Sequence, residues 1–153
     1  MVSAAAAREF LSQRRIAVVG VSRDPRQLAN LLFRALREQG CEAIPVNPRA
    51  AELEGAPAYP SVQQIPGPVD GAIVMLPPAA RRAAVLDLIG AGVPRIWFQS
   101  PTGPGVDADL AALAAESGAR VLNGGCPFMF LEGAGWFHRL HGVIARWTHE
   151  VQG

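Results

Sequence analysis

Short runs of apolar residues alternate along the chain with longer stretches in which apolar residues recur every three or four positions. The first run, residues 16–19 (IAVV), is mostly β-branched and ends at Gly20, which is typical of a strand buried on both faces. Four later runs have the same character: residues 43–46, 71–76, 95–98 and 119–122. The pattern therefore predicts five short strands, and Pro45 inside the second predicts a position at the edge of a sheet.

The stretches between these runs predict helices. Residues 24–40 carry leucines at helical spacing, and Asp24-Pro25 is expected to provide the N-cap and the first helical residue. A second helix is expected from Pro77-Pro78 to about residue 90, and a third over residues 107–117. The apolar face of the second helix would be formed by Ala83, Leu86 and Ile89.

Strands that alternate with amphipathic helices form βαβ units, in which right-handed crossovers join parallel strands. We therefore predict an α/β fold: a three-layer, Rossmann-like, doubly wound parallel sheet of five strands. The chain is expected to form a single domain with its core at about 14–127 and extra helices at 3–13 and about 134–151. The connector 49–69, rich in proline and glycine, is expected to hold one helical turn capped by Ser61.

Composition narrows the classes of function. The chain has 153 residues, half of them apolar, with 14 basic and 13 acidic side chains. It is too apolar for a disordered region and too balanced in charge to predict a surface for nucleic acid or membranes. All 14 basic residues are arginines, so a Walker-type phosphate loop and Schiff-base chemistry, which both need lysine, are excluded. With two cysteines and no apolar stretch of membrane-spanning length, we expect a cytoplasmic protein.

Unusual residues gather where the predicted strands end. In an open α/β sheet, ligands bind beyond the carboxyl ends of the strands, at the point where the strand order reverses. The candidate binding residues at these ends are Gly20, Val21, Ser22, Arg23, Asn47, Pro48, Arg49, Leu76, Pro77, Pro78, Gln99, Ser100 and Cys126. Polar and glycine-proline turns on one rim of a sheet indicate a nucleotide-binding cleft.

The turn after the first strand predicts contact with phosphate. Gly20 lets the backbone approach an anion closely, amides at the start of the following helix can cradle it, and Ser22 and Arg23 can add a hydroxyl and a charge. The three spaced glycines of the dinucleotide fingerprint are missing, and Asn47 stands where NAD-binding proteins carry an acidic residue. With Arg49 nearby, this favours a ligand with an extra phosphate over plain NAD. A simple strand-to-helix turn is the alternative that these residues leave open.

Five fragments, in this order, resemble one family: IAVVGVS (16–22), VNP (46–48), VD (69–70), WFQ (97–99) and CP (126–127). At these intervals they resemble the small stand-alone CoA-binding proteins. The same fold forms the CoA-binding domain of the succinyl-CoA synthetase alpha subunit and of nucleoside-diphosphate-forming acyl-CoA synthetases. The resemblance covers roughly residues 14–127 and implies a Rossmann-like domain that binds coenzyme A or an acyl-CoA.

The resemblance also implies particular contacts near the nucleotide. Gly20 and Ser22 would lie under the pyrophosphate of CoA. Asn47 and Pro48 would flank the adenosine, with Arg49 near its 3′-phosphate.

Further contacts are implied along the rest of the ligand. Pro77-Pro78 would line the CoA channel as in the ligases, and Gln99 and Cys126 would face the cleft from the far side. Many stand-alone members carry Phe-Arg where this chain has Leu76-Pro77, so the arginine contact of that subgroup is not expected. The ligases hold their phosphorylated histidine in a second domain for which this sequence has no segment, so ligase chemistry is not predicted.

No catalytic constellation is predicted, because Ser22 and Ser100 lack an evident His-Asp pairing. Cys126 has two interpretations: a cleft-facing thiol able to form a mixed disulfide with CoA, or a small apolar residue packed beneath its loop. His138 and His141 have a spacing that can place both on one zinc ion, but we interpret them as solvated residues of the closing helix. No metal site is therefore predicted.

Three functional hypotheses follow. The first is a non-catalytic module that binds CoA or an acyl-CoA. The second is an NAD(P)-binding enzyme or redox sensor on the same sheet, and the third is a protein-interaction module with an empty cleft. The apolar stripe of the closing helix (about 134–151) either packs on its own chain or forms a homodimer. Arg81 and Arg82, in the first turns of the second helix, are expected to be solvated.

Overall fold

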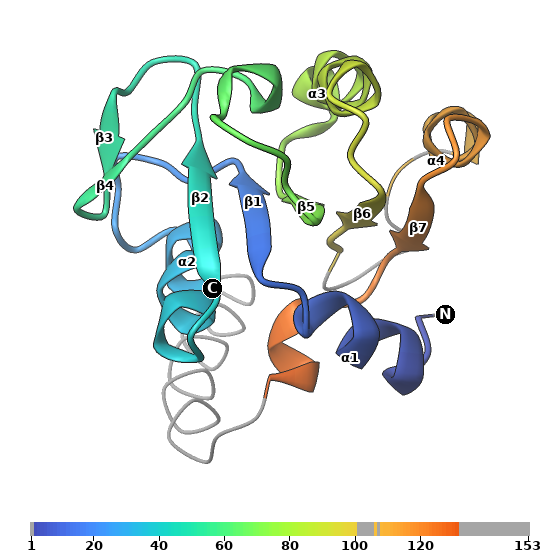
Figure 1. The fold of residues 1–153 in the computed structure, drawn as a ribbon, viewed down its shortest axis with the longest axis horizontal. Helices are drawn as coiled ribbons and strands as arrows, with labels where there is room; N and C mark the ends of the chain where they lie inside the picture. Colours follow the sequence, from blue (N-terminus) through green and yellow to red (C-terminus); the bar gives the residue numbers. More distant parts are fainter. Residues whose placement is uncertain (1, 101–105, 107, 132–153) are drawn as a thin grey trace, which may run out of the picture.

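The computed structural model describes residues 2–100, 106 and 108–131. Five parallel strands form its central sheet in the order β2-β1-β5-β6-β7 (Figure 1). The strands are β1 (Arg15–Val19), β2 (Glu42–Val46), β5 (Gly71–Val74), β6 (Arg95–Phe98) and β7 (Arg120–Asn123). The five predicted strands and their parallel pairing are confirmed. The helix expected at about 134–151, with His138 and His141, lies outside the described residues.

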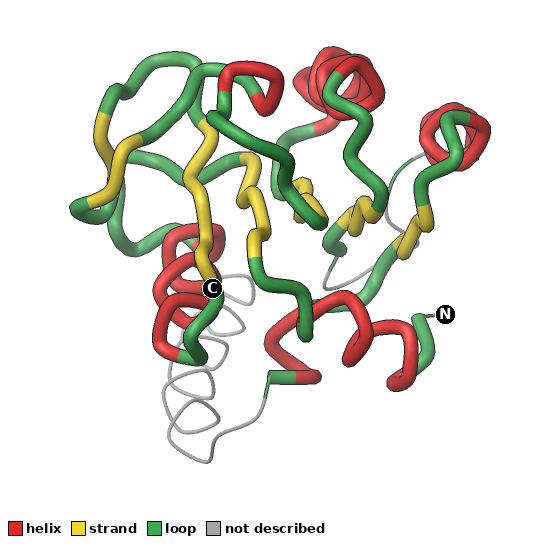
Figure 2. Tube along the Cα trace, viewed as in Figure 1, coloured by secondary structure: helices red, strands yellow, loops and turns green. Residues whose placement is uncertain are grey.

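Helices cover both faces of the sheet (Figures 1 and 2). On one face lie α1 (Ala4–Leu11), α2 (Leu28–Glu38) and the 3-10 turn η2 (Pro127–Phe130). On the other lie α3 (Pro78–Gly90), α4 (Ala108–Glu116) and the 3-10 turn η1 (Val62–Gln64). Successive strand residues point to opposite faces, so β1 contributes Ile16 and Val18 to one core and Ala17 and Val19 to the other. The predicted three-layer α/β fold is confirmed.

The helices of the described part of the chain are too short or too polar to cross a membrane. The N-terminal helix expected at 3–13 is α1, and Ser3 caps it by accepting a hydrogen bond from the Ala6 N–H at 3.1 Å. The third predicted helix is α4, which begins at Ala108. These elements frame the sheet without covering the carboxyl ends of β1 and β5.

The strand order reverses between β1 and β5. From β1 the chain crosses through α2 to β2 on one side, whereas β5, β6 and β7 follow on the other side. Because α2 and α3 lie on opposite faces of the sheet, a crevice opens between their N-termini, where open α/β sheets bind ligands. The edge position that Pro45 predicts is also confirmed, since β2 is an outer strand.

Helix α2 begins three residues later than predicted, at Leu28, and its N-cap is Gln27. Asp24-Pro25 lies instead in a turn, because local hydrogen bonds compete with the helix. Ser22 Oγ accepts from the Asp24 N–H at 2.8 Å, and Asp24 Oδ1 accepts from the Arg26 N–H at 3.0 Å. These bonds satisfy the backbone outside the helix and move its start toward Leu28.

Of the apolar face predicted for α3, only Ile89 packs against the core, and Ala83 and Leu86 are exposed. Val85 and Leu88 are the buried residues of this helix, whereas Leu86 is 51% exposed. The helix contains several alanines, so its sequence pattern does not distinguish two neighbouring faces. Contact with the sheet decides between them.

The connector contains a hairpin that the sequence pattern does not predict. Its strands are β3 (Glu52–Leu53) and β4 (Ala56–Pro57). Glu54 and Gly55 join them, both at positive φ, as the tight two-residue turns of hairpins require. The predicted helical turn is present as η1, with Ser61 at its N-cap position. The Ser61 side chain makes no cap hydrogen bond, and the Val62 N–H donates instead to the Asp87 carboxylate at 2.6 Å.

Gly20 ends β1 where this strand passes close to β5. Its φ of +120° lies in a region that side-chain-bearing residues rarely adopt, and a Cβ there would lie 2.2 Å from the carbonyl oxygen of Met75. Backbone hydrogen bonds join the neighbouring strands here: Met75 N–H donates to Val19 O at 2.9 Å, and Gly20 N–H donates to Val46 O at 3.2 Å. The ends of three strands are therefore tied together at this glycine.

We expect Gly20→Ala to lower the free energy of unfolding by about 2–4 kcal/mol, since backbone strain and a steric clash act together. Gly40→Ala is the matched control. Gly40 also has a positive φ (+87°), but a Cβ there would meet nothing within 4 Å, so only the strain, about 1 kcal/mol, is expected. Chemical denaturation measures both variants. Equal losses of stability in the two variants would contradict an added cost from the close approach of residue 20 to the Met75 carbonyl oxygen.

Candidate functional site

A cavity of about 550 Å³ opens at the carboxyl ends of the strands, between the turns that follow β1 and β5. Its walls come from these two turns, the starts of α2 and α3, and the end of β6. The lining residues are Gly20, Ser22, Gln27, Leu28, Ala29, Met75, Leu76, Pro77, Arg81, Gln99 and Ser100. The first cavity therefore lies at the point where the strand order reverses.

A second cavity, of about 680 Å³, lies on the β2 side and shares Gly20 and Leu76 with the first. Its other lining residues are Val19, Val46, Asn47, Pro48, Pro60, Ser61, Gln63, Gln64, Ala80, Ala83, Ala84 and Asp87. Most of these side chains are apolar or uncharged. We call the two cavities together the cleft; each has the size of a typical small-molecule site, and together they suit an elongated ligand.

The starts of α2 and α3 make the first cavity favourable for an anion. Neither helix has a side-chain cap or an acidic residue in its first turn. Leu28 and Ala29, which open α2, line the cavity, and the first amides of a helix have no acceptor within it. Two positive helix ends therefore meet at one cavity with no carboxylate of their own to neutralise them.

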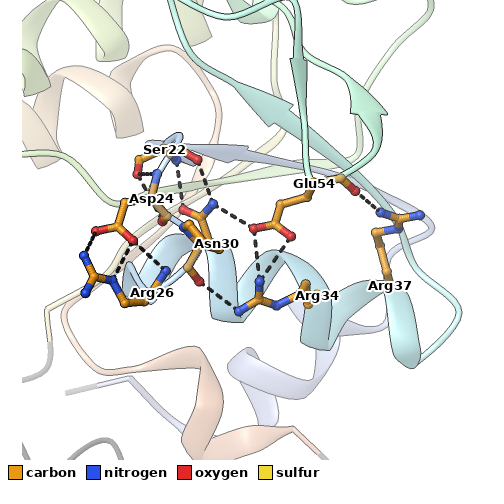
Figure 3. A network of polar contacts seen from close by, with 8 residues as sticks. Ser22, Asp24, Arg26, Asn30, Arg34, Arg37 and Glu54 are labelled. Atoms are coloured by element: carbon orange, nitrogen blue, oxygen red, sulfur yellow. Dashed lines mark hydrogen bonds and ion pairs between the residues drawn. The ribbon is translucent and has the colours of Figure 1, made fainter.

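Asn30 holds the turn after β1 (Figure 3). This side chain is 1% exposed. Its Oδ1 accepts from the Ser22 N–H at 2.9 Å, and its Nδ2 donates to Ser22 O at 2.7 Å. The Ser22 backbone is therefore satisfied inside the protein, and its hydroxyl bonds both the N–H and the carbonyl oxygen of Asp24, at 2.8 Å and 3.2 Å.

The same network reaches the unpredicted hairpin. Asn30 Nδ2 also donates to Glu54 Oε1 at 2.9 Å, and Arg34 Nη1 pairs with that oxygen at 3.1 Å (Figure 3). Arg37 Nη1 donates to the Glu54 carbonyl oxygen at 2.9 Å. Because the Glu54 side chain is only 13% exposed, its charge is well shielded from water and depends on these partners. The hairpin thus braces the turn after β1 through α2.

A second asparagine holds the turn from the β2 side. Asn47 Nδ2 donates to Val21 O at 2.9 Å, and its Oδ1 accepts from the Arg49 N–H at 2.7 Å. The Arg23 guanidinium donates to the Arg49 carbonyl oxygen. The backbone at Val21 and Ser22 is therefore fixed between two asparagine side chains that belong to different elements.

Residues 14–132 match the family described as CoA binding domain. The chain belongs to this family. Over 125 residues it is 33% identical to the alpha subunit of ADP-forming acetate–CoA ligase II from Pyrococcus furiosus, covering 76% of this chain and 27% of that subunit. The chain thus spans about a quarter of the ligase subunit's length.

Two further comparisons concern relatives of similar length. The CoA-binding domain is 30% identical over 121 residues to the uncharacterized protein YneT of Bacillus subtilis, covering 78% of this chain and 87% of that one. A solved structure, a hypothetical protein from Pyrococcus horikoshii OT3, superposes with a TM-score of 0.76 at 29% identity. That match covers 86% of this chain and 94% of the other. The resemblance to CoA-binding proteins is confirmed.

Eight of the predicted binding residues line the cleft of this CoA-binding domain: Gly20, Ser22, Asn47, Pro48, Leu76, Pro77, Gln99 and Ser100. The other five do not line either cavity. Val21 is buried, Arg23 and Arg49 are exposed, and Pro78 is the first residue of α3. Cys126 packs against the core on the α1 and α2 side. Contact of any of these residues with a ligand stays a prediction.

Sequence reasoning misses two residues beside the cleft. Asn30 carries a signal, since it is a polar residue within the buried stripe of α2. Arg81, expected to be solvated, is partly buried and lines the first cavity, with its Nε donating to Leu76 O at 3.0 Å. Arg82 is exposed, as expected. The signal at Arg81 is a cation near the start of a helix, where the helix dipole disfavours it.

Gln99 lines the first cavity, and its side chain lies beside the Cys126 thiol. Its Nε2 is buried and has no hydrogen-bond partner among the described residues. The next residue, Ser100, is held by its N–H, which donates to Gly125 O at 3.0 Å.

Both cysteines are free thiols with raised pKa values. Burial raises the pKa of Cys41 to about 11. Burial also raises the pKa of Cys126, and the Phe128 amide and the Gln99 side chain offset part of this effect. A protonated thiol is a poor nucleophile, which favours the packed interpretation of Cys126 over a mixed disulfide. Within the described ranges, no three His, Cys, Asp or Glu side chains gather to hold a metal ion.

At pH 8 we expect Cys41 to be alkylated about 100-fold more slowly in the folded protein than in denaturant, because its thiolate fraction is that much smaller. Labelling with iodoacetamide followed by peptide mass spectrometry measures the rate. The stabilisation linked to this thiol is complete below its unfolded pKa and is lost as pH rises toward about 11. Similar rates in the folded and denatured chains would contradict the raised pKa.

Asn30→Ala is expected to cost about 2–4 kcal/mol of stability, because the Ser22 backbone and the Glu54 carboxylate lose partners. Hydrogen exchange at the Ser22 amide should also become faster. Arg26→Ala is the control: Arg26 pairs with Asp24 on the surface, so little change is expected in either measurement. Unchanged protection of the Ser22 amide in the Asn30 variant would contradict its role in holding the turn.

Proposed function

We propose that this CoA-binding domain binds coenzyme A or an acyl-CoA in the cleft, as a binding or regulatory module. The observation that carries the proposal is the meeting of two uncapped helix starts at the first cavity. A diphosphate placed there would accept hydrogen bonds from amides of α2 and offset the positive ends of both helices. Membership of the CoA binding domain family supports the same ligand.

The shape of the cleft supports one direction for the ligand. The second cavity, between the end of β2 and α3, would take the adenosine against Val46, Pro48 and the alanines of α3. Arg23 and Arg49 are exposed beyond the end of β2 and can interact with a 3′-phosphate. Pantetheine would then extend along the first cavity toward the end of β6. There Gln99 and Ser100 line the cavity.

Plain NAD fits this cleft less well. NAD-binding proteins of this fold class hold the ribose 2′-hydroxyl with a carboxylate at the end of the second strand, and here Asn47 occupies that position. Asp87 lines the second cavity, but its oxygens already accept from the N–H groups of Val62 and Gln63, at 2.6 Å and 3.3 Å. Neither residue offers a free carboxylate to a ribose.

The proposal concerns binding and assigns no acyl transfer. The ligase subunit that the chain resembles is much longer than the matched segment, and the activity in its name is that of the ligase of which it is one subunit. Two free cysteines with protonated thiols fit a reducing compartment such as the cytoplasm. Which acyl group the pantetheine arm carries depends on the far end of the first cavity.

Isothermal titration with CoA, NADH and NADPH tests the proposal. We expect saturable binding of CoA with one site per chain, and much weaker binding of NADH. Binding of NADPH without binding of CoA would overturn the proposal in favour of an NAD(P)-binding protein. Binding of none of the three ligands would favour the interaction module.

Gln27→Glu should separate binding from folding. A carboxylate at the N-cap of α2 complements the helix dipole, so stability should hold or rise by a few tenths of a kcal/mol. The same charge repels a diphosphate in the first cavity, so CoA should bind about 10-fold more weakly or worse. Gln39→Glu makes the same change in charge at the other end of α2 and should leave CoA affinity unchanged. Wild-type affinity in the Gln27 variant would contradict this placement of the diphosphate.

A further inference from the structure

Arg81 has more hydrogen-bonding capacity than its partners in the described part of the chain use. Its Nε donates to Leu76 O at 3.0 Å, which anchors the guanidinium beside the turn after β5. Among the described residues no carboxylate or other acceptor pairs with its two terminal amino groups. Since Arg81 lines the first cavity, these donors are available to a bound molecule.

The charge of Arg81 is placed against the local preference of its helix. Cations are disfavoured near the positive N-terminus of a helix, and α3 has no acidic residue in its first turn to compensate. The helix opens with Pro77-Pro78, whose nitrogens cannot donate hydrogen bonds. The electrostatic conflict would be relieved by an anion in the cavity, and features that oppose a local rule are expected at functional sites.

The opposite wall of the cavity has the matching chemistry. Ser22, in the turn after β1, and Leu28 and Ala29, at the start of α2, line the same cavity as Arg81. An anion between them would receive amide hydrogen bonds from one side and the guanidinium from the other. A guanidinium has parallel donors suited to two phosphate oxygens, which makes this arrangement selective for phosphate over smaller or neutral groups.

We propose that Arg81 is the cationic side chain that binds the diphosphate of the ligand and selects phosphate-bearing ligands at this cleft. It supplies from α3 a charge that Leu76-Pro77 cannot supply from the end of β5. This inference rests on the proposed function for the identity of the ligand, but anion binding at Arg81 can be tested separately.

The experiment compares Arg81→Gln with Arg82→Gln by calorimetric titration. Arg82 is the adjacent, exposed arginine of the same helix, so the two variants lose the same charge at neighbouring positions. The probes are CoA, dephospho-CoA and inorganic diphosphate. We expect Arg81→Gln to weaken all three by about 10- to 100-fold, as loss of a charge-assisted pair implies, and Arg82→Gln to change each less than about 3-fold. Arg81→Lys should recover only part of the affinity, because lysine lacks the parallel donors.

Each other outcome has a distinct meaning. A loss of affinity confined to CoA would place Arg81 at the 3′-phosphate and overturn the inference. Equal losses of affinity in the two glutamine variants, or no loss in either, would also overturn it. If circular dichroism shows that the Arg81→Gln protein is unfolded, Arg81→Lys replaces it as the test variant. Wild-type affinity of Arg81→Lys for the three probes would then overturn the inference that the guanidinium selects phosphate. Wild-type protein that binds inorganic diphosphate through Arg81 but does not bind CoA would overturn the proposed function and leave the inference standing.

Discussion

The turn after β1 has to leave the sheet, pass close to β5 and form one wall of a cavity, all within a few residues. Regular strand and helix hydrogen bonds cannot hold such a segment, so side chains do. Asn30 pairs with both backbone groups of Ser22, and Asn47 pairs with the carbonyl of Val21. Because these bonds are largely shielded from water, the turn is held firmly, and the rest of the cleft is organised around its position.

The layers of the fold then direct the electrostatics of the site. Helices α2 and α3 lie on opposite faces of the sheet, yet both begin at its carboxyl edge, on either side of the reversal in strand order. Their positive ends converge on one cavity, and Arg81 adds a full charge to it. A protein without acids at these helix starts forgoes the usual local stabilisation, which a bound diphosphate can restore. The fold therefore places unneutralised positive charge at the cavity, and a bound diphosphate would neutralise it.

Much of the fold can be predicted from the sequence because buried parallel strands leave continuous apolar runs such as residues 16–19. Prediction fails where residues distant in sequence decide the structure. The start of α2 depends on the Ser22 and Asp24 turn, and the role of Asn30 is visible only when Glu54 of the hairpin, 24 residues away, is placed beside it. The turn residues that follow the predicted strands indicate from sequence where most of the cleft lies. Arg81 is missed because an arginine on a helix usually faces water, and only the cavity shows where it lies.

The central claim is that the ligand's phosphates lie at the starts of α2 and α3. Titration of isotope-labelled protein with CoA, followed by amide chemical shifts in NMR spectra, tests it most directly. The account predicts the largest changes at the amides of Gly20, Leu28, Ala29 and Ser100, which line the first cavity. Changes concentrated instead in the groove between α1 and β7, around Ser3 and Val121, would contradict it, as would saturation without any change at Leu28 and Ala29.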